Sequence, residues 1–294
     1  MKKTGFIAIV GRPNVGKSTL LNSILGEKVA IVSSKPQTTR NRIIGIHTVG
    51  DDQFVFLDTP GIFKPRNSLG SFMVKTANSS MQDADAVILV IDAGKPISDI
   101  EKNVIKYVKN NEVPSVLVLN KIDLYRREQI AETIAAYAAL HDFDAVVPIC
   151  AKNGKGVEEV LDECKKFLGE SEFFFPEDTL TDQPERVLAA EMIREKLLHR
   201  LNEEIPHGIA VSIEKMRERE DKPILDIEAI IYCERESHKG IVIGKKGAML
   251  KEISTNARHE LENFFECKVN LQCWVKVKED WRNREGLIHN FGLD

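Results

Sequence analysis

The sequence predicts a doubly wound α/β domain followed by a smaller α+β domain. The length of 294 residues suits two domains better than one. Up to about residue 168, short apolar runs alternate with amphipathic stretches. From Arg186 the order changes to helix, two strands, two helices and a strand. Hydrophobic residues at 43% and charged residues at 29% are typical of an ordinary globular chain.

The first domain is expected to span residues 1–169. Its predicted strands are Phe6–Val10, Ile43–Thr48, Phe54–Leu57, Ala86–Ile91, Ser115–Leu119 and Ala145–Ile149. Its predicted helices are Lys17–Leu25, Leu69–Gln82, Ile97–Asn110, Arg127–His141 and Gly156–Leu168. Continuous apolar strands that alternate with helices indicate a buried parallel sheet with right-handed crossovers. Ligands are therefore expected at the carboxyl ends of the strands.

Residues 170–185 are expected to form a linker, because they contain two prolines, many acids and no clear period. The apolar residues Phe173–Phe175 predict that this linker packs against one of the domains. The second domain is expected over residues 186–294, with a three-stranded sheet. Its predicted elements are helix Arg186–Leu201, strands Ile209–Met216 and Ile224–Glu234, helix–turn–helix Lys239–Phe265 and strand Lys268–Val277.

The segment Gly11–Ser18, GRPNVGKS, lies between the first predicted strand and the first predicted helix. This spacing is typical of a loop whose backbone N–H groups surround the phosphates of a nucleoside triphosphate. The helix that follows adds the positive end of its dipole. Lys17 would neutralise the β- and γ-phosphates, and the Ser18 hydroxyl would bind Mg²⁺. The expected contacts from this segment are Gly11, Asn14, Val15, Gly16, Lys17, Ser18 and Thr19.

Two further loops are expected to sense the γ-phosphate. In Asp58-Thr59-Pro60-Gly61, the Asp58 carboxylate can hold Mg²⁺ through water, and the Gly61 N–H can bond the γ-phosphate. In Pro36–Arg40, one threonine would reach Mg²⁺ and the γ-phosphate only in the triphosphate state. Thr39 is favoured, with Thr38 as the alternative.

Two motifs predict that the base is guanine. The Asp123 carboxylate of Asn120-Lys121-Ile122-Asp123 only accepts hydrogen bonds, so it can take both guanine N1–H and N2–H₂. Adenine offers neither donor, and such a mismatch discriminates by on the order of 10⁴-fold or more. Asn120 would tie the base site to the phosphate loop, and the Lys121 stem would cover a ring face. Cys150-Ala151-Lys152 can supply a backbone N–H to guanine O6.

In the second domain, Gly244-Lys245-Lys246-Gly247 joins two predicted helices. The segment from Arg235 to Arg258 contains six basic and two acidic residues. Its local net charge is +4, in a chain whose net charge is −4. This arrangement is typical of the KH domain, whose Gly-x-x-Gly turn clamps about four single-stranded nucleotides. The expected RNA contacts are Lys239, Ile243, Gly244, Lys245, Lys246, Gly247 and Lys251.

Two interpretations stay open in this domain. The aliphatic residues around the turn, such as Ile241, Val242 and Ile253, can line a groove for bases or belong to the core. The basic residues of Lys276–Arg284, together with Trp281, can extend the RNA surface or cap the domain.

The remaining composition points to a cytoplasmic protein. The five cysteines are scattered and never form a CxxC pair, which favours reduced thiols over disulfides or zinc. No apolar stretch approaches the roughly 18 residues of a membrane-spanning helix. Met1–Gly5 leads directly into a strand, so no signal peptide is expected.

The five motifs GRPNVGKS, PQTTR, DTPG, NKID and CAK resemble those of the translation-factor-related GTPases. Cys150 departs from this pattern, because serine is usual there. Ile62 stands where Ras-type enzymes have the glutamine that orients water, so slow unaided hydrolysis of GTP is expected. In relatives with asparagine at the Asn14 position, that side chain helps bind K⁺, so Asn14 is a candidate K⁺ ligand; a role in loop conformation is the alternative. The resemblance gives the catalytic roles to Lys17, Thr39 and Gly61.

A GTPase domain followed by a type II KH domain is similar to the Era family across essentially the whole chain. That resemblance implies a monomeric cytoplasmic GTPase that binds the 3′ end of 16S ribosomal RNA and assists assembly of the 30S subunit. It also implies peripheral association with the inner membrane. We expect GTP to order the Pro36–Arg40 and Asp58–Asn67 loops and thereby to change RNA affinity. Two alternatives are a GTPase whose KH-like domain binds protein and an RNA-binding module with little GTP turnover.

Overall fold

The computed structural model describes residues 1–293, and contacts divide them into two compact units. The first unit comprises Met1–Val32, Thr39–Pro65 and Gly70–Asp182. The second comprises the residues from Gln183 onward together with two short segments, Ser33–Thr38 and Arg66–Leu69. No helix among residues 1–293 is both long enough and apolar enough to cross a membrane.

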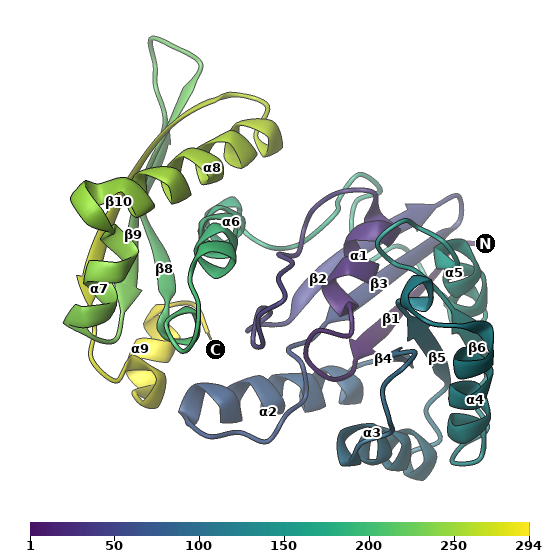
Figure 1. Ribbon diagram of the computed structural model, residues 1–294. Coiled ribbons are helices and arrows are strands. Elements are labelled where there is room, and N and C mark those ends of the chain that lie inside the picture. Colours follow the sequence, from purple (N-terminus) through teal and green to yellow (C-terminus); the bar gives the residue numbers. More distant parts are fainter. Residues whose placement is uncertain (294) are drawn as a thin grey trace. The chain divides into compact units, whose positions relative to one another are not determined.

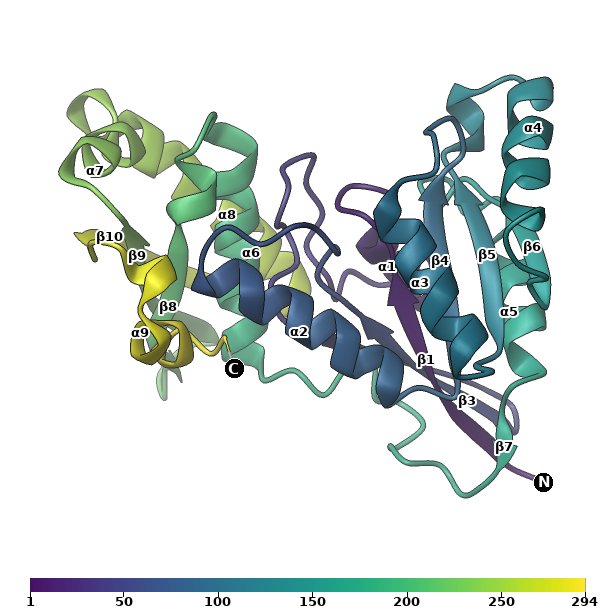
Figure 2. The same ribbon diagram turned by 90° about the horizontal axis from the view of Figure 1, so that it is seen from below.

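The first unit is a twisted sheet with helices on both faces, in the order β2-β3-β1-β4-β5-β6 (Figures 1 and 2). Its strands are β1 (Lys3–Val10), β2 (Ile43–Val49), β3 (Asp52–Asp58), β4 (Ala86–Asp92), β5 (Ser115–Asn120), β6 (Ala145–Pro148) and β7 (Gly169–Glu170). Its helices are α1 (Lys17–Leu25), α2 (Ser68–Gln82), α3 (Asp99–Asn110), α4 (Arg127–Ala138), α5 (Val157–Lys165) and the 3₁₀ turn η1 (Ile122–Leu124). This confirms the predicted α/β class.

Buried apolar side chains hold the helices to the sheet. Every residue of β4 is buried, as expected for a strand covered on both faces. On one face, residues of β1, β4 and β5 pack with Met81 of α2, Val104 and Val108 of α3 and Tyr137 of α4. On the other face, α1 and α5 pack against each other and the sheet. The carboxyl ends of β1, β3, β4 and β5 therefore open onto one edge, where the predicted motifs lie.

Two strands differ from a purely parallel arrangement. β2 runs antiparallel to β3, because the two strands are joined by a tight turn at 50–51 that cannot hold a crossover. β7, at the start of the expected linker, pairs antiparallel with β1. Farther along the linker, the Phe174 ring stacks on the Phe6 ring, with 5.3 Å between the ring centroids. The Gln53 side-chain oxygen accepts hydrogen bonds from the backbone N–H groups of Phe174 and Phe175. The aromatic residues of the linker thus pack on the first unit.

The second unit is a three-stranded sheet in the order β10-β9-β8, with helices α6, α7 and α8 on one face (Figure 1). Its strands are β8 (Ala210–Glu218), β9 (Ile224–Cys233) and β10 (Lys268–Val277). Its helices are α6 (Glu185–Arg200), α7 (Glu236–Ile243), α8 (Ala248–Phe264) and α9 (Glu285–Asn290), with the 3₁₀ turns η2 (Pro206–Gly208), η3 (Lys245–Gly247) and η4 (Trp281–Asn283). β8 is antiparallel to β9, and β10 is parallel to it. This is the α+β domain that the sequence predicts.

Alternation along the strands separates the two faces of this sheet. Odd-numbered residues of β9 and β10, such as Ile227, Ile231 and Val269, belong to the core with residues of α6, α7 and α8. Even-numbered residues, such as Glu228 and Trp274, therefore lie on the opposite face.

The residues of Lys276–Arg284 divide between the two interpretations left open for that segment. The Trp281 side chain is fully buried, and its indole N–H donates to the Gly208 carbonyl at 2.9 Å. The Arg282 guanidinium binds the Glu234 carboxylate with two hydrogen bonds of 3.0 and 2.6 Å. Trp281 and Arg282 thus cap the domain, whereas Lys276 and Lys278 of the same segment are exposed.

Candidate nucleotide and RNA sites

The loop between β1 and α1 has a backbone that only glycine fits at two positions. Gly11 has φ +149°, and an added Cβ would lie 2.3 Å from the Val90 carbonyl oxygen. Gly16 has φ +101°, and an added Cβ would lie 2.1 Å from the Asn120 side-chain nitrogen. These contacts explain the glycines at the first and sixth positions of GRPNVGKS.

Lys17 lies at the start of α1 and is buried. Its ammonium group donates to the carbonyl oxygens of Gly11, at 3.3 Å, and Arg12, at 3.0 Å. Burial lowers the pKa of Lys17 to about 8, although Asp58 nearby raises it. The ammonium group is therefore held against the inside of the phosphate-binding loop.

Three oxygen-bearing side chains from separate elements meet beside Lys17. The Ser18 hydroxyl donates to Asp58 Oδ2 at 2.6 Å and lies 2.9 Å from the Thr39 hydroxyl. Thr38 instead donates to the Lys35 carbonyl at 2.7 Å, within its own loop. Thr39 is thus the threonine whose hydroxyl meets Ser18, which in turn binds Asp58.

The Asp58 carboxylate is fully buried at the end of β3. Burial raises its pKa to about 6, against the opposing effects of Lys17 and the Ser18 hydrogen bond. Among residues 1–293, its Oδ1 atom has no hydrogen-bond partner. A buried carboxylate oxygen without a partner beside two hydroxyls is a set of oxygen ligands that suits Mg²⁺.

Gly61, the last residue of the DTPG segment that begins at Asp58, lies against the phosphate loop. An added Cβ would lie 2.7 Å from the backbone of Pro13, so no larger residue fits without movement of the loop. The next amide, Ile62 N–H, donates to the Gly11 carbonyl at 3.1 Å. The DTPG segment and the phosphate loop are therefore in direct backbone contact.

Asn120, at the end of β5, joins three of the predicted motifs. Its side-chain NH₂ donates to the Val15 carbonyl at 2.8 Å. Its side-chain oxygen accepts the backbone N–H of Lys121, at 2.8 Å, and of Ala151, at 3.0 Å. All of these groups are buried or partly buried, so the amide holds the phosphate loop and the two base loops in one arrangement.

Asp92 is a site residue that the sequence analysis missed. Its carboxylate accepts hydrogen bonds from Lys121 Nζ at 3.0 Å and from the Tyr125 hydroxyl at 2.7 Å. Burial raises the pKa of Asp92, but these two hydrogen bonds outweigh it and the net pKa is lowered. Lys121 Nζ also donates to the Asn14 carbonyl at 2.7 Å, so its stem is fixed across the base site. The available signal was a carboxylate directly after the apolar strand AVILVI.

Asp123 lies next to the Cys150-Ala151-Lys152 loop. Burial raises the pKa of the Cys150 thiol, and a hydrogen bond with the Asp123 carboxylate raises it further. The backbone N–H groups of Cys150 and Ala151 donate to Lys155 O and to Asn120, respectively. The backbone N–H groups of Lys152 and Asn153 hydrogen-bond with the Cys150 thiol, which opposes the rise in its pKa.

The remaining residues of the phosphate loop support its shape. Val15 is buried, and Thr19 is half-buried in the first turn of α1. Asn14 has φ +63°, a left-handed conformation that asparagine tolerates better than most residues. This conformation gives the loop-shape interpretation of Asn14 a structural basis.

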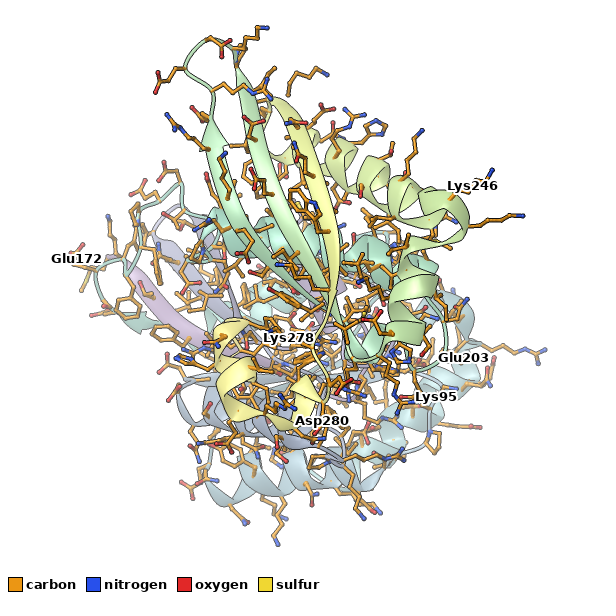
Figure 3. All side chains as sticks on the ribbon, turned by 90° about the vertical axis from the view of Figure 1, so that its left-hand side faces the viewer. Lys95, Glu172, Glu203, Lys246, Lys278 and Asp280 are labelled. Atoms are coloured by element: carbon orange, nitrogen blue, oxygen red, sulfur yellow. The ribbon has the colours of Figure 1, made fainter. Side chains whose placement is uncertain are left out.

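In the second unit, the Gly244–Gly247 turn joins α7 to α8. Gly244 has φ +73°, and an added Cβ would lie 2.6 Å from the Met249 Cβ. Gly247 and Lys246 also have positive φ angles, +78° and +51°. Lys245 and Lys246 are exposed, and Figure 3 shows Lys246 pointing away from the turn.

The lysines around this turn keep their charge unpaired within residues 1–293. No ion pair within these residues involves any of the four lysines around the turn, which are Lys239, Lys245, Lys246 and Lys251. Two nearby acids are bound by arginines instead, Glu252 by Arg200 and Glu262 by Arg258. Unpaired lysines beside a glycine turn are suited to a phosphate backbone.

The aliphatic residues around the turn divide between the two open interpretations. Val242 and Ile253 are fully buried in the core. Ile241 is 49% exposed and Ile243 is half-buried, so these two can contact a ligand.

The comparisons with known proteins agree with both units. The family described as "50S ribosome-binding GTPase" matches residues 6–121, and the family described as "KH domain" matches residues 204–282. The chain is 51% identical over 295 residues to the GTPase Era of Clostridioides difficile (strain 630), covering 100% of this chain and 99% of that protein.

Two solved structures are similar over nearly the whole chain. One is Era in complex with MgGDPNP and nucleotides 1506–1542 of 16S ribosomal RNA, with a TM-score of 0.96, 41% identity and coverage of 100% and 99%. The other is a variant of Aquifex aeolicus Era bound to GDP.AlF4⁻, with a TM-score of 0.95, 41% identity and coverage of 99% of each chain. With the five motifs gathered at one sheet edge and a Gly-x-x-Gly turn in a three-stranded domain, this chain belongs to the Era family of GTPases.

Proposed function

We propose that this GTPase is a switch that binds the 3′ end of 16S ribosomal RNA through its KH domain and assists assembly of the 30S subunit. The observation that carries the RNA proposal is the Gly244–Gly247 turn with its exposed, unpaired lysines. Similarity to an Era structure that contains a 16S fragment supports the choice of RNA.

In this proposal GTP lies across the motifs of the first unit. Lys17 binds the β- and γ-phosphates, and Gly61 N–H binds the γ-phosphate. Asp123 accepts the guanine donors, and a backbone N–H of the Cys150-Ala151-Lys152 loop donates to guanine O6. Ser18, Thr39 and Asp58 hold Mg²⁺, which when bound neutralises phosphate charge. Their mutual distances, 2.6 and 2.9 Å, and the free Asp58 oxygen support this set.

We further propose that hydrolysis depends on K⁺ held by Asn14. Ile62 cannot orient water, so an added cation would supply charge that the protein lacks. GTP turnover measured in K⁺ and in Na⁺ tests this role. Equal rates would leave Asn14 with its loop-shape role alone.

The nucleotide state is proposed to control RNA binding. Thr39 contacts Ser18 in the first unit, while the preceding residues, Ser33–Thr38, group with the second unit. Within the second unit, the buried Arg194 guanidinium donates to the Thr38 carbonyl. A change at Thr39 on loss of the γ-phosphate would therefore reach the second unit through one peptide bond.

Binding to single-stranded RNA tests the proposed function directly. Gly244→Asp should abolish binding, because the added side chain meets Met249. Since that variant can also distort the turn, Lys245→Gln and Lys246→Gln provide a second test that leaves the backbone unchanged. We expect each to lower affinity and to reduce the salt slope by about one. Lys215→Gln, on β8 of the same unit, is the charge-matched control. Unchanged RNA affinity in both lysine variants would favour a protein ligand for this domain.

Turnover distinguishes the remaining alternative. Release of phosphate from GTP, measured with and without RNA, separates an active GTPase switch from a module that binds nucleotide without significant turnover. A cytoplasmic location, a monomeric state and peripheral association with the inner membrane are proposals that rest on the family resemblance. Cell fractionation, light scattering and sedimentation with anionic vesicles test them.

A further inference from the structure

The two tryptophans of the chain lie in opposite environments. Trp281 is fully buried, whereas Trp274, in the middle of β10, is 45% exposed. Phe174 is the other exposed aromatic side chain among the large apolar residues of the described chain, and it already stacks on Phe6. Within residues 1–293, Trp274 makes no ring-stacking or cation–π contact. Burial of this ring against a ligand would therefore be favourable.

Trp274 lies on the face of the sheet that the helices α6, α7 and α8 do not cover. Its neighbours in β10, Cys273 and Val275, pack toward the core, so Trp274 points the other way. Gln272 and Lys276 share its face, and Ile230 of β9 lies opposite it in the register. Figure 3 looks onto this open face of the sheet, with Lys278 labelled at the end of β10.

Free positive charge on this face is concentrated next to Trp274. Other basic side chains here are neutralised: Lys215 pairs with Glu228 at 3.3 Å, and Arg219 pairs with Asp226 at 2.7 Å. Lys276 and Lys278 form no ion pair within residues 1–293. The strand thus presents an aromatic ring followed by two unpaired ammonium groups.

Helix α9 covers only the neighbouring part of this face. The Phe291 ring lies 4.8 Å from Tyr232, the residue that pairs with Lys276. Phe291 also lies edge-on to the buried Trp281, at 5.2 Å. The position of Trp274, two residues earlier in the strand, stays exposed beside this cover.

An exposed ring with adjacent lysines on an open sheet face has the chemistry of a single-stranded nucleic acid site. Bases stack on the ring, and the ammonium groups bind the phosphates between them. A protein partner would need a continuous apolar patch, but the side chains around Trp274 include Gln272 and Lys276. The charge and the isolated aromatic ring therefore favour RNA.

The position of β10 connects this face to the Gly244–Gly247 turn. β10 is the edge strand of the sheet, and α7 and α8, the helices on either side of the turn, pack against it. An RNA strand that leaves the turn along β10 can reach the other face without crossing another strand. We propose that nucleotides flanking those held at the glycine turn stack on Trp274, with Lys276 and Lys278 binding their phosphates. This inference rests on the proposed RNA-binding function.

RNA length separates the two parts of the site. A tetranucleotide should occupy the turn alone, since the KH clamp holds about four nucleotides. For a single strand of about 12 nucleotides, within the site sizes of such proteins, Trp274→Ala should lower affinity about 10-fold. Tetranucleotide affinity should not change, and Trp274→Phe should retain most of the affinity for the longer RNA.

Fluorescence of the full-length protein provides a second readout. The longer RNA should quench the wild-type tryptophan emission, and this quenching should be lost in Trp274→Ala, which retains the buried Trp281. Lys276→Gln should reduce the salt slope for the longer RNA by about one. The matched control is Lys268→Gln, an equal loss of charge on the same strand at a lysine that lies 3.8 Å from Glu262.

The outcomes distinguish this inference from the proposed function. If the wild type binds both RNAs and Trp274→Ala binds the longer one equally well, the Trp274 site is wrong while RNA binding at the glycine turn stands. If the wild type binds neither RNA, the proposed function itself fails, and the inference fails with it.

Discussion

At the scale of single residues, the site depends on side chains that make several hydrogen bonds at once. The Asn120 side-chain amide hydrogen-bonds with the backbone of Val15, Lys121 and Ala151. The Asp92 carboxylate accepts hydrogen bonds from the side chains of both Lys121 and Tyr125. Such residues leave several buried groups unpaired when they are removed, which makes single substitutions informative.

The Asp123 carboxylate is predicted to set the choice of base. Asp123→Asn replaces an acceptor with an amide donor that mismatches the guanine N2–H₂ group. GTP affinity should fall by on the order of 10²-fold or more, and xanthosine triphosphate, with an oxygen at that position, should bind better than it does to the wild type. Competition against a fluorescent GDP analogue measures both. Asp123→Ala is the control, because it should weaken GTP without a gain for the xanthine base.

Tyr137 is predicted to destabilise the folded state through its hydroxyl group. The side chain is fully buried in α4, and its hydroxyl has no hydrogen-bond partner within residues 1–293. Tyr137→Phe should therefore raise the free energy of unfolding by about 1 kcal/mol. Urea unfolding at pH 7 checks this value, and a less stable variant would contradict it.

The same residue predicts a pH dependence. Burial raises the pKa of Tyr137, and the negative charge of Glu101 raises it further against the opposing effect of Arg12. The unfolded tyrosine ionises near pH 10, so the folded state loses stability as the pH rises above about 10 toward the raised pKa. The phenylalanine variant lacks this loss, so its advantage over the wild type should grow above pH 10. A constant difference across that range would show that Tyr137 ionises normally when folded.

At the scale of elements, helix α3 supports the phosphate loop through its N-terminus. The Ser98 side chain caps the helix, and the Glu101 carboxylate accepts a hydrogen bond from the Ser98 backbone N–H at 2.9 Å. The other oxygen of the buried Glu101 lies 2.5 Å from the Arg12 guanidinium of the phosphate loop. One carboxylate therefore completes the cap and holds the loop.

Loss of this cap should be measurable in the stability of the first unit. Ser98→Ala removes the side-chain acceptor for the helix and should cost about 1 kcal/mol. For a domain of this size we expect a fall in melting temperature of about 2–4 °C. Ser98→Thr keeps a capping hydroxyl and serves as the control; equal melting temperatures for wild type and Ser98→Ala would contradict the role of the cap.

At the scale of the whole molecule, the loops expected to respond to GTP are divided between the units. Ser33–Thr38 and Arg66–Leu69 group with the second unit, whereas Thr39–Pro65 groups with the first. Because each loop is covalently continuous across this division, nucleotide state and RNA affinity are predicted to be linked. Linkage then requires RNA to change nucleotide affinity by the same factor.

RNA affinity measured with GDP and with a non-hydrolysable GTP analogue tests this link. We expect a difference within about 5–150-fold, the usual range of coupling between sites. Arg194→Met removes the hydrogen bond to the Thr38 carbonyl and should shrink the difference while RNA binding persists. Equal affinities for the two wild-type forms would exclude the coupling.

Much of the fold and of the site could be predicted from sequence because both depend on local patterns. β10 begins and ends at its predicted residues, and the strands before the motifs are runs of apolar residues that periodicity detects. Asp92 was missed because one carboxylate after a strand has no motif of its own. Trp281 and Trp274 differ only in what covers them, which no local pattern records.

The sequence by itself determined the two-domain architecture, the order of elements and the family, because spacing and hydrophobic period are properties of the chain. The tertiary structure alone decided which threonine meets Ser18 and which tryptophan stays exposed to solvent. It also decided which backbone groups form hydrogen bonds with the Asn120 side chain. Those outcomes depend on contacts between segments far apart in sequence, so only the folded backbone brings the partners within bonding distance.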